Sequence, residues 1–161
     1  MDKWDERYLR LAKEVSTWSK DPSTKVGAIA VLDGSVLAQG YNGFPKGVND
    51  DPAKYANRET KYKYTVHAEM NCIFNAAQNG VSLYGSTLYI YPLPACHECA
   101  KGIIQAGVVR VVSPVFENEF TQKRWEQSCT TTFQMFEEAG IQYDLVKGFT
   151  SVWFYGIIYP I

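Results

Sequence analysis

Two short motifs in this sequence carry side chains that often bind metals: His67-Ala68-Glu69 and Cys96-His97-Glu98-Cys99. Each motif begins a segment with helical spacing, and Cys96 and Cys99, three residues apart, share one face of a helix. Together with His67 they provide three zinc ligands, and no fourth ligand suggests itself beside them. A structural zinc site closes with four protein ligands, whereas a catalytic site keeps one position for water. The ligand count therefore predicts a catalytic zinc site.

The carboxylate of Glu69 is the candidate catalytic group. Zinc held by two thiolates and a neutral imidazole has no formal net charge, so it acidifies its water less than zinc held by three histidines. Glu69 lies two residues after the histidine, where it can take the proton of that water and return it to a substrate. The N-termini of both ligand-bearing helices favour thiolate over thiol. These features together predict Glu69 as the general base and acid.

Two other interpretations of the same residues remain open. A Cys-x-x-Cys pair also occurs in redox proteins, and a zinc ion can serve only to stabilise a fold. Replacing Glu69 separates catalysis from stabilisation, because a purely structural site does not need that carboxylate. Cys72 and Cys129 lie on apolar helix faces and are expected to be small buried hydrophobic residues. His97 is expected to be a polar residue of the first helical turn.

The motifs must be positioned by elements that alternate along the chain. A first helix is expected over residues 3–18, with an apolar face at steps of three and four. That face contains Trp4, Tyr8, Leu11, Ala12, Val15 and Trp18. Two antiparallel strands follow at 26–32 and 36–41, joined at Asp33-Gly34, and a polar, turn-rich loop covers 42–64. Later helices are expected at 68–77, 96–106 and 124–139, and later strands at 87–91, 108–112 and 142–146.

The order of these elements indicates the fold class. Helices between apolar strands are typical of parallel crossover connections and of a sheet covered on both faces. We therefore expect an α/β fold, a three-layer α/β/α sandwich around a mixed five-stranded sheet. The 161 residues fit a single domain over 1–161, without repeats or linkers. The apolar tail from Val152 to Ile158, within residues 148–161, predicts either a further strand or a subunit contact.

Composition excludes several classes of function. The sequence has 16 Lys and Arg against 17 Asp and Glu, a net charge of −1, unlike proteins that bind nucleic-acid backbones. It contains no apolar run long enough to span a membrane and no signal peptide at its start. We expect a cytoplasmic protein whose four cysteines serve metal chemistry or packing rather than disulfides.

The two motifs are similar to the signature of the zinc-dependent cytidine and deoxycytidylate deaminase superfamily, His-x-Glu followed by Cys-x-x-Cys. The sequence resembles in particular the branch that acts on deoxycytidylate (dCMP), through further strings that lie mostly within residues 4–112. These are Ser19-Lys20-Asp21-Pro22-Ser23, Val26-Gly27-Ala28, Gly40-Tyr41-Asn42-Gly43, Lys61-Tyr62-Lys63-Tyr64 and the run from Cys99 to Gly107. Beyond Val112 the resemblance fades. Ala95 stands where a proline is expected, with Pro94 one residue earlier, and Val48 stands where some relatives carry a cysteine for a second zinc ion.

The resemblance implies a cytidine deaminase-like fold and a hydrolytic reaction. The reaction would convert dCMP to dUMP and ammonia and would feed dTMP synthesis. His67, Cys96 and Cys99 would hold one zinc ion per chain, because Val48 removes a ligand of the second. Hydroxide on zinc would attack C4 of cytosine, with Glu69 as the proton shuttle.

The resemblance also assigns substrate contacts. Asn42 would contact the sugar, and the backbone of Ala68 would read the cytosine carbonyl. Further substrate contacts are expected at Ser23, Lys25, Tyr64 and Pro94. The 5′-phosphate is expected to meet backbone amides of the 21–25 turn and the 42–64 loop. Nearby lysines that could also bind it are Lys25, Lys46, Lys61 and Lys63.

Regulation and rival substrates complete the expectations. The resemblance implies a homo-oligomer, a dimer or a hexamer, controlled by dCTP and dTTP through Gly40, Tyr41, Asn42 and Gly43. Other members of the superfamily act on 5-substituted dCMP, free nucleosides, guanine or adenosine in tRNA, and the metal motif alone does not separate these substrates. The near-neutral charge argues against tRNA. We predict dCMP because the strings outside the metal motif point to it.

Overall fold

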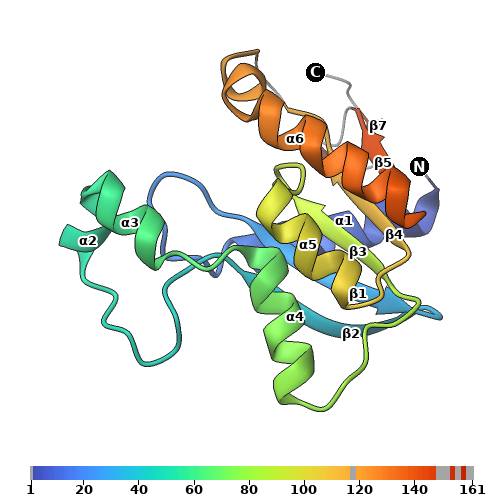
Figure 1. Ribbon diagram of the computed structural model, residues 1–161, viewed down its shortest axis with the longest axis horizontal. Coiled ribbons are helices and arrows are strands. Elements are labelled where there is room, and N and C mark those ends of the chain that lie inside the picture. The colour runs from blue at the N-terminus through green and yellow to red at the C-terminus, as the bar shows by residue number, and fades with distance from the viewer. Residues whose placement is uncertain (1, 117–118, 148–152, 155–156, 159–161) are drawn as a thin grey trace.

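The computed structural model describes residues 2–116, 119–147, 153–154 and 157–158. Its centre is a five-stranded sheet with helices on both faces, which confirms the expected three-layer α/β/α fold (Figure 1). The strands of this sheet are β1 (Gly27–Leu32), β2 (Ser35–Tyr41), β3 (Thr87–Tyr91), β4 (Arg110–Pro114) and β5 (Gln142–Val146). The helices are α1 (Lys3–Ser16), α2 (Pro52–Ala56), α3 (Arg58–Tyr64), α4 (Ala68–Gln78), α5 (His97–Gln105) and α6 (Glu119–Ala139).

The sheet is mixed, as predicted, and its strand order is β2-β1-β3-β4-β5. Strand β1 pairs antiparallel with β2 and β3, whereas β3, β4 and β5 run parallel. The β1–β2 hairpin turns at Asp33 and Gly34, whose φ angles of 49° and 78° fit the predicted tight turn. Strand β4 begins at Arg110, two residues later than predicted, because the chain first turns at Gly107, where φ is 76°.

Helix α1 covers one face of the sheet. The contact consists of Leu9, Ala12 and Val15 from the helix and Ile29, Val31, Tyr89, Val112 and Val146 from the sheet. The predicted apolar face is wrong at three positions, because Trp4, Leu11 and Trp18 are 56%, 40% and 49% exposed. Trp18 lies beyond the end of the helix, and Asp5 takes the buried position in the first turn. A buried carboxylate therefore sets the rotation of the helix.

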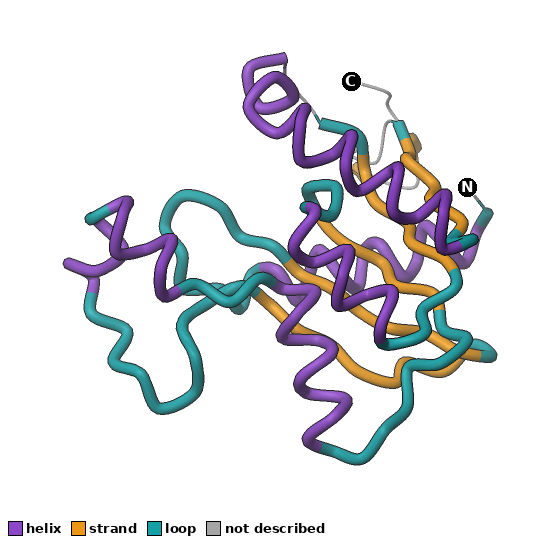
Figure 2. The backbone as a smooth tube through the Cα atoms, in the orientation of Figure 1, coloured by secondary structure: helices purple, strands orange, loops and turns teal. Residues whose placement is uncertain are grey.

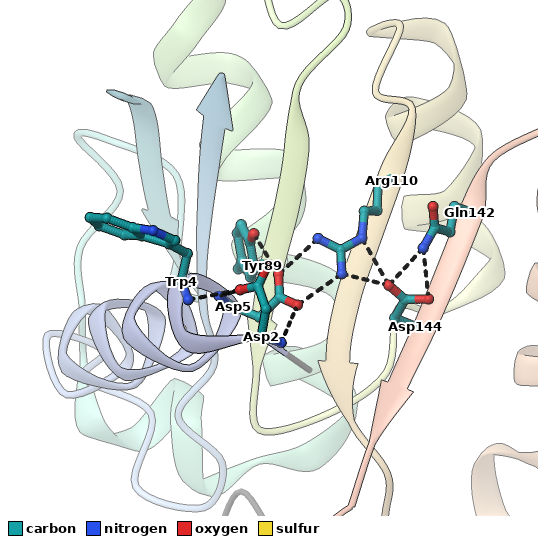
Figure 3. A network of polar contacts seen from close by, with 7 residues as sticks. All are labelled: Asp2, Trp4, Asp5, Tyr89, Arg110, Gln142 and Asp144. Carbon is teal, nitrogen blue, oxygen red and sulfur yellow. Dashed lines mark hydrogen bonds and ion pairs between the residues drawn. The ribbon is translucent and has the colours of Figure 1, made fainter. Parts of the chain in front are cut away.

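Asp5 is held against the sheet by a polar network (Figure 3). Its carboxylate accepts hydrogen bonds from the Arg110 guanidinium at 2.8 and 2.9 Å and from the Tyr89 hydroxyl at 2.9 Å. Arg110 also donates to Asp144 on β5 at 2.8 Å. Burial alone would raise the pKa of Asp5, but hydrogen bonds from Arg110 and the Asp2 backbone lower it to about 2. The network fastens the first turn of α1 to β3, β4 and β5.

Helices α4, α5 and α6 cover the other face, where the larger part of the core lies (Figure 1). Fully buried side chains of this core include Leu88, Ile90, Ile103, Val111 and Phe136. Cys72 is fully buried among them, whereas Cys129 on α6 is only partly buried. Gly40 in β2 lets α4 lie close to the sheet, because a Cβ there would be 2.2 Å from the backbone nitrogen of Cys72.

The segment between β2 and α4 is not simply the loop predicted over 42–64, because it contains the short helices α2 and α3 (Figure 2). Backbone hydrogen bonds of 3.1 and 2.8 Å between Gly43 and Val66 close its base. Inside it, Phe44 stacks on the buried Tyr55 with ring centroids 4.2 Å apart. Val66 directly precedes His67, so the bridge between Gly43 and Val66 helps to position the first predicted zinc ligand.

The last described residues form two short strands, β6 (Trp153–Phe154) and β7 (Ile157–Ile158), that pair antiparallel. They belong to the apolar tail Val152–Ile158, for which we expected a further strand or a subunit contact; residues 152, 155 and 156 of that tail lie outside the described residues. Among the residues that the structure describes, no helix combines the length and the apolar character needed to cross a membrane.

Candidate metal centre and cavity

The predicted zinc ligands meet where α4 and α5 begin. His67 is the N-cap residue of α4, Cys96 is the N-cap residue of α5, and Cys99 lies in the first turn of α5. The Nδ1 atom of His67 is 3.4 Å from the Sγ atom of Cys96 and 3.3 Å from the Sγ atom of Cys99. All three candidate ligand atoms lie within 4.8 Å of one another.

This donor set fits one zinc ion. Zn–N bonds near 2.0 Å and Zn–S bonds near 2.3 Å place tetrahedral ligands about 3.6 Å apart, close to the spacing of these nitrogen and sulfur atoms. The side chains of His67 and Cys96 make no capping hydrogen bond to their helices, so their donor atoms are free for a metal. Within the described part of the chain, these residues are the one group of three or more His, Cys, Asp or Glu side chains that could hold a metal ion. Three protein ligands leave the fourth position of zinc to water or substrate.

Hydrogen bonds within the cluster already favour a thiolate. The pKa of Cys96 falls to about 4, chiefly through its hydrogen bond with Cys99, and the pKa of His67 rises to about 9, chiefly through its hydrogen bond with Cys96. The pKa of Cys99 is raised, because it shares a hydrogen bond with Cys96 and is buried. Because metal ligands bind in their deprotonated forms, zinc binding at this cluster would release protons.

Glu69 lies in the first turn of α4, beside the cluster. Its side chain is buried, and this burial raises the pKa of its carboxyl group. Glu69 lines the same cavity as His67 and Cys96. A carboxyl group in this position can exchange protons with a molecule bound in the cavity.

The cavity has a volume of about 250 Å³. Several elements distant in sequence form its walls: the 21–26 segment, Asn42, α3, the start of α4, the 93–96 turn and α6. The cavity volume is slightly below the roughly 300 Å³ at which pockets for small ligands begin, so the cavity suits a compact small molecule.

Three predicted substrate contacts line this cavity: Asn42, Ala68 and Pro94. The carboxamide of Asn42 also has a role in the fold, because it accepts a hydrogen bond from the Val26 N–H at 2.8 Å and donates one to the Thr24 carbonyl at 2.9 Å. Asn42 therefore fixes the 24–26 segment at the cavity wall. Ala68 presents the first turn of α4, whose N–H groups have no partner within the helix.

The other predicted contacts, Ser23, Lys25 and Tyr64, do not line the cavity. The Ser23 backbone N–H donates to Asp21, Lys25 donates to a backbone carbonyl at 3.4 Å, and the Tyr64 ring packs against Phe44. Of the four lysines considered for a phosphate, Lys61 alone lines the cavity. Lys46 and Lys63 instead bond side chains on the surface.

The cavity lining also contains Thr65, Arg124 and Trp125, which the sequence analysis did not single out, and Tyr62, which lies in one of the strings of the resemblance. Arg124 and Trp125 contribute to this lining from α6, and Tyr62 and Thr65 contribute from α3 and its end. Helix α6 lies beyond Val112, where the resemblance fades. Its side chains reach the cavity only because α6 packs against α5, a contact that no local pattern reveals.

A comparison with known families identifies the chain. Residues 2–114 match the family described as the cytidine and deoxycytidylate deaminase zinc-binding region. The chain belongs to this deaminase family. The match covers more than half of the chain and includes the three zinc ligands and Glu69, so the metal for which the site is built in this family is zinc.

Similar proteins extend over most of the chain. A deaminase of Aliivibrio fischeri of uncharacterised activity is 37% identical over 88% of this chain and 92% of its own length. The deoxycytidylate deaminase of Mus musculus is 35% identical over 87% of this chain and 78% of its own length. The dCMP deaminase of cyanophage S-TIM5, solved in complex with dCMP and dUMP, is 29% identical with a TM-score of 0.70, over 91% of this chain and 99% of its own.

Proposed function

We propose that this deaminase hydrolyses dCMP to dUMP and ammonia, with one zinc ion per chain as cofactor. The observation that carries this proposal is that His67, Cys96 and Cys99 meet close to the buried Glu69. Three of these residues, His67, Cys96 and Glu69, line one cavity of about 250 Å³. The choice of dCMP is supported by the mouse deoxycytidylate deaminase and by the cyanophage enzyme that binds dCMP and dUMP.

The residues of the cavity support this chemistry. Zinc bound to the cluster supplies Lewis-acid activation of the attacking water. Glu69 accepts a proton from the water and delivers it to ring N3, and then assists proton transfer to the exocyclic amine. The new bond joins the water oxygen to C4 of cytosine, and the bond from C4 to the exocyclic nitrogen breaks as ammonia leaves.

Binding of the base follows from the walls around the cluster. The N-terminal turn of α4 at Ala68 supplies backbone N–H groups for the cytosine carbonyl. Pro94 and Leu93 supply apolar surface beside the ring, and Asn42 borders the position of the sugar.

Ultraviolet absorbance separates the proposal from its rivals, because deamination of cytosine changes the spectrum. We expect dCMP to be deaminated with kcat/KM at least about 10²-fold above that of deoxycytidine, a difference of roughly 2.7 kcal/mol. CMP, dCTP, 5-methyl-dCMP and guanine complete the panel. A substrate other than dCMP with the highest kcat/KM would replace the proposed activity within the same family.

Three finer proposals rest on the family resemblance. We expect a homo-oligomer and control by dCTP and dTTP through the 40–43 segment, which ends β2 and borders the cavity at Asn42. A reducing cytoplasm suits a site that depends on two free thiols. Size-exclusion chromatography with light scattering and rate measurements with added dCTP or dTTP test the first two.

A further inference from the structure

The charges that line the cavity are not equivalent. Apart from His67 of the metal cluster, two cationic side chains line it, Lys61 and Arg124. The Lys61 ammonium lies 2.8 Å from the Asp21 carboxylate, and both side chains are nearly buried, with 13% and 2% exposed. The same carboxylate oxygen accepts the N–H groups of Ser23 and Thr24 at 2.8 and 3.2 Å. The charge of Lys61 is therefore balanced within the wall.

Arg124 is in a different environment. Its guanidinium group donates a hydrogen bond to the hydroxyl of Tyr62 and lies 5.9 Å from the centre of the Tyr62 ring and 5.6 Å from that of Trp125. A second guanidinium, that of Arg58, lies 5.4 Å from the centre of the same Tyr62 ring. Within the described residues, neither arginine forms an ion pair with a carboxylate, in contrast to Arg10 and Arg110.

Two guanidinium groups beside one tyrosine repel each other, and an anion bound near them would relieve that repulsion. Burial alone would raise the pKa of Tyr62, but hydrogen bonds to Arg58 and Arg124 lower it. The planar donor fork of arginine matches the oxygens of a phosphate. The part of the cavity lining that α3 and α6 contribute therefore offers a guanidinium group, that of Arg124, which can bind an anion.

We propose that Arg124, oriented by Tyr62 and assisted by the charge of Arg58, binds the 5′-phosphate of the nucleotide substrate. This inference rests on the proposed function, which places the base at His67 and Glu69. The phosphate then lies toward α6, at the cavity lining that carries Arg124. The assignment differs from our expectation that the lysines and the 21–25 turn bind the phosphate, because Lys61 is neutralised by Asp21 and Lys25 does not line the cavity.

The test compares Arg124→Gln with Lys63→Gln. Lys63 is the matched control, since it is an exposed cation on α3 that pairs with Glu59 and does not line the cavity. We expect Arg124→Gln to lower kcat/KM for dCMP by about 10- to 100-fold, the range for losing a charge-assisted contact. The loss for deoxycytidine should be much smaller, so the preference for dCMP falls. Arg124→Lys should be intermediate, because it keeps the charge without the fork.

A binding measurement separates failure of this inference from failure of the proposed function. Calorimetric titration with dUMP and with deoxyuridine needs no turnover, and we expect Arg124→Gln to weaken binding of dUMP much more than binding of deoxyuridine. If dCMP is turned over but Arg124→Gln keeps the full preference for phosphorylated ligands, the assignment of Arg124 is overturned and the function stands. If dCMP is not a substrate but dUMP binding still depends on Arg124, the phosphate site stands and the function fails. Unchanged melting temperature and zinc content show that the variant is folded.

Discussion

Substitution of Gly40 by alanine tests how the sheet positions the catalytic helix. A Cβ at this position would lie 2.2 Å from the Cys72 nitrogen, 2.5 Å from the Ala68 carbonyl oxygen and 2.7 Å from the Asn71 carbonyl carbon. All three are backbone atoms of α4, so no side chain can rotate away to make room. The helix as a whole must move away from β2.

The size of this movement follows from the contacts. Real Cβ atoms essentially never approach other heavy atoms below 3.0 Å, so the start of α4 must shift by roughly 0.8 Å or more. His67 and Glu69 lie at this end of the helix, whereas Cys96 and Cys99 belong to α5 and stay in place. Overpacking of this kind costs about 1–3 kcal/mol of stability. A displacement near 1 Å of catalytic groups costs up to about 10²-fold in rate.

The assay measures the unfolding midpoint in urea, zinc per chain by elemental analysis, and kcat for dCMP. Gly43→Ala is the control for stability and zinc content, since a Cβ there meets nothing within 4 Å. We expect Gly40→Ala to unfold at lower urea concentration, to release zinc more readily and to turn over slowly. A Gly40→Ala protein with normal stability and zinc content would refute the close seating of α4 on β2.

Three further predictions concern the network at α1 and the metal centre. Asp5→Asn should lower the free energy of unfolding by about 2 kcal/mol at pH 7, because the pKa of Asp5 falls from 3.8 to about 2 on pairing with Arg110. A lowered folded-state pKa stabilises the fold above pH 4 and the benefit disappears as the pH falls toward 2, so urea titrations of the two proteins should converge there. Glu69→Gln should keep fold and zinc but lower kcat by at least about 10²-fold, and near-normal turnover in a zinc-loaded sample would refute the proton-transfer role. Purified protein should contain about one zinc per chain, lost in Cys99→Ser and kept in Cys129→Ser; two zinc ions per chain would contradict the single site.

Local patterns predicted those parts of the fold that depend on neighbours in sequence. The Asp33-Gly34 turn and strand β5 appear where their residues indicated. The buried face of α1 was predicted only in part, because its rotation also depends on Asp5, whose partner Arg110 lies 105 residues away. A charged residue in a helix is normally assigned to the solvent side, and only the distant arginine reverses that preference.

The two short helices in the segment 42–66 were not predicted, for a different reason. Helices α2 and α3 have 5 and 7 residues, too short to form alone in water or to show a clear apolar period. They are held by tertiary contacts, such as the stacking of Phe44 on Tyr55 and the bridge between Gly43 and Val66. Composition predicted a functional loop, but its order comes from contacts that composition does not encode.

The candidate site also has one part that local sequence predicts and one part that depends on contacts between distant residues. The metal end is encoded in two compact motifs, because a ligand, its helix start and the neighbouring carboxylate are adjacent in sequence. The arginine end exists only because α3 and α6 meet, where the Tyr62 hydroxyl accepts a hydrogen bond from Arg124, 62 positions away in the sequence. The two ends should therefore be separable by mutation. Glu69→Gln should slow the chemical step while dUMP still binds, whereas Arg124→Gln should weaken dUMP binding while the metal centre keeps its zinc.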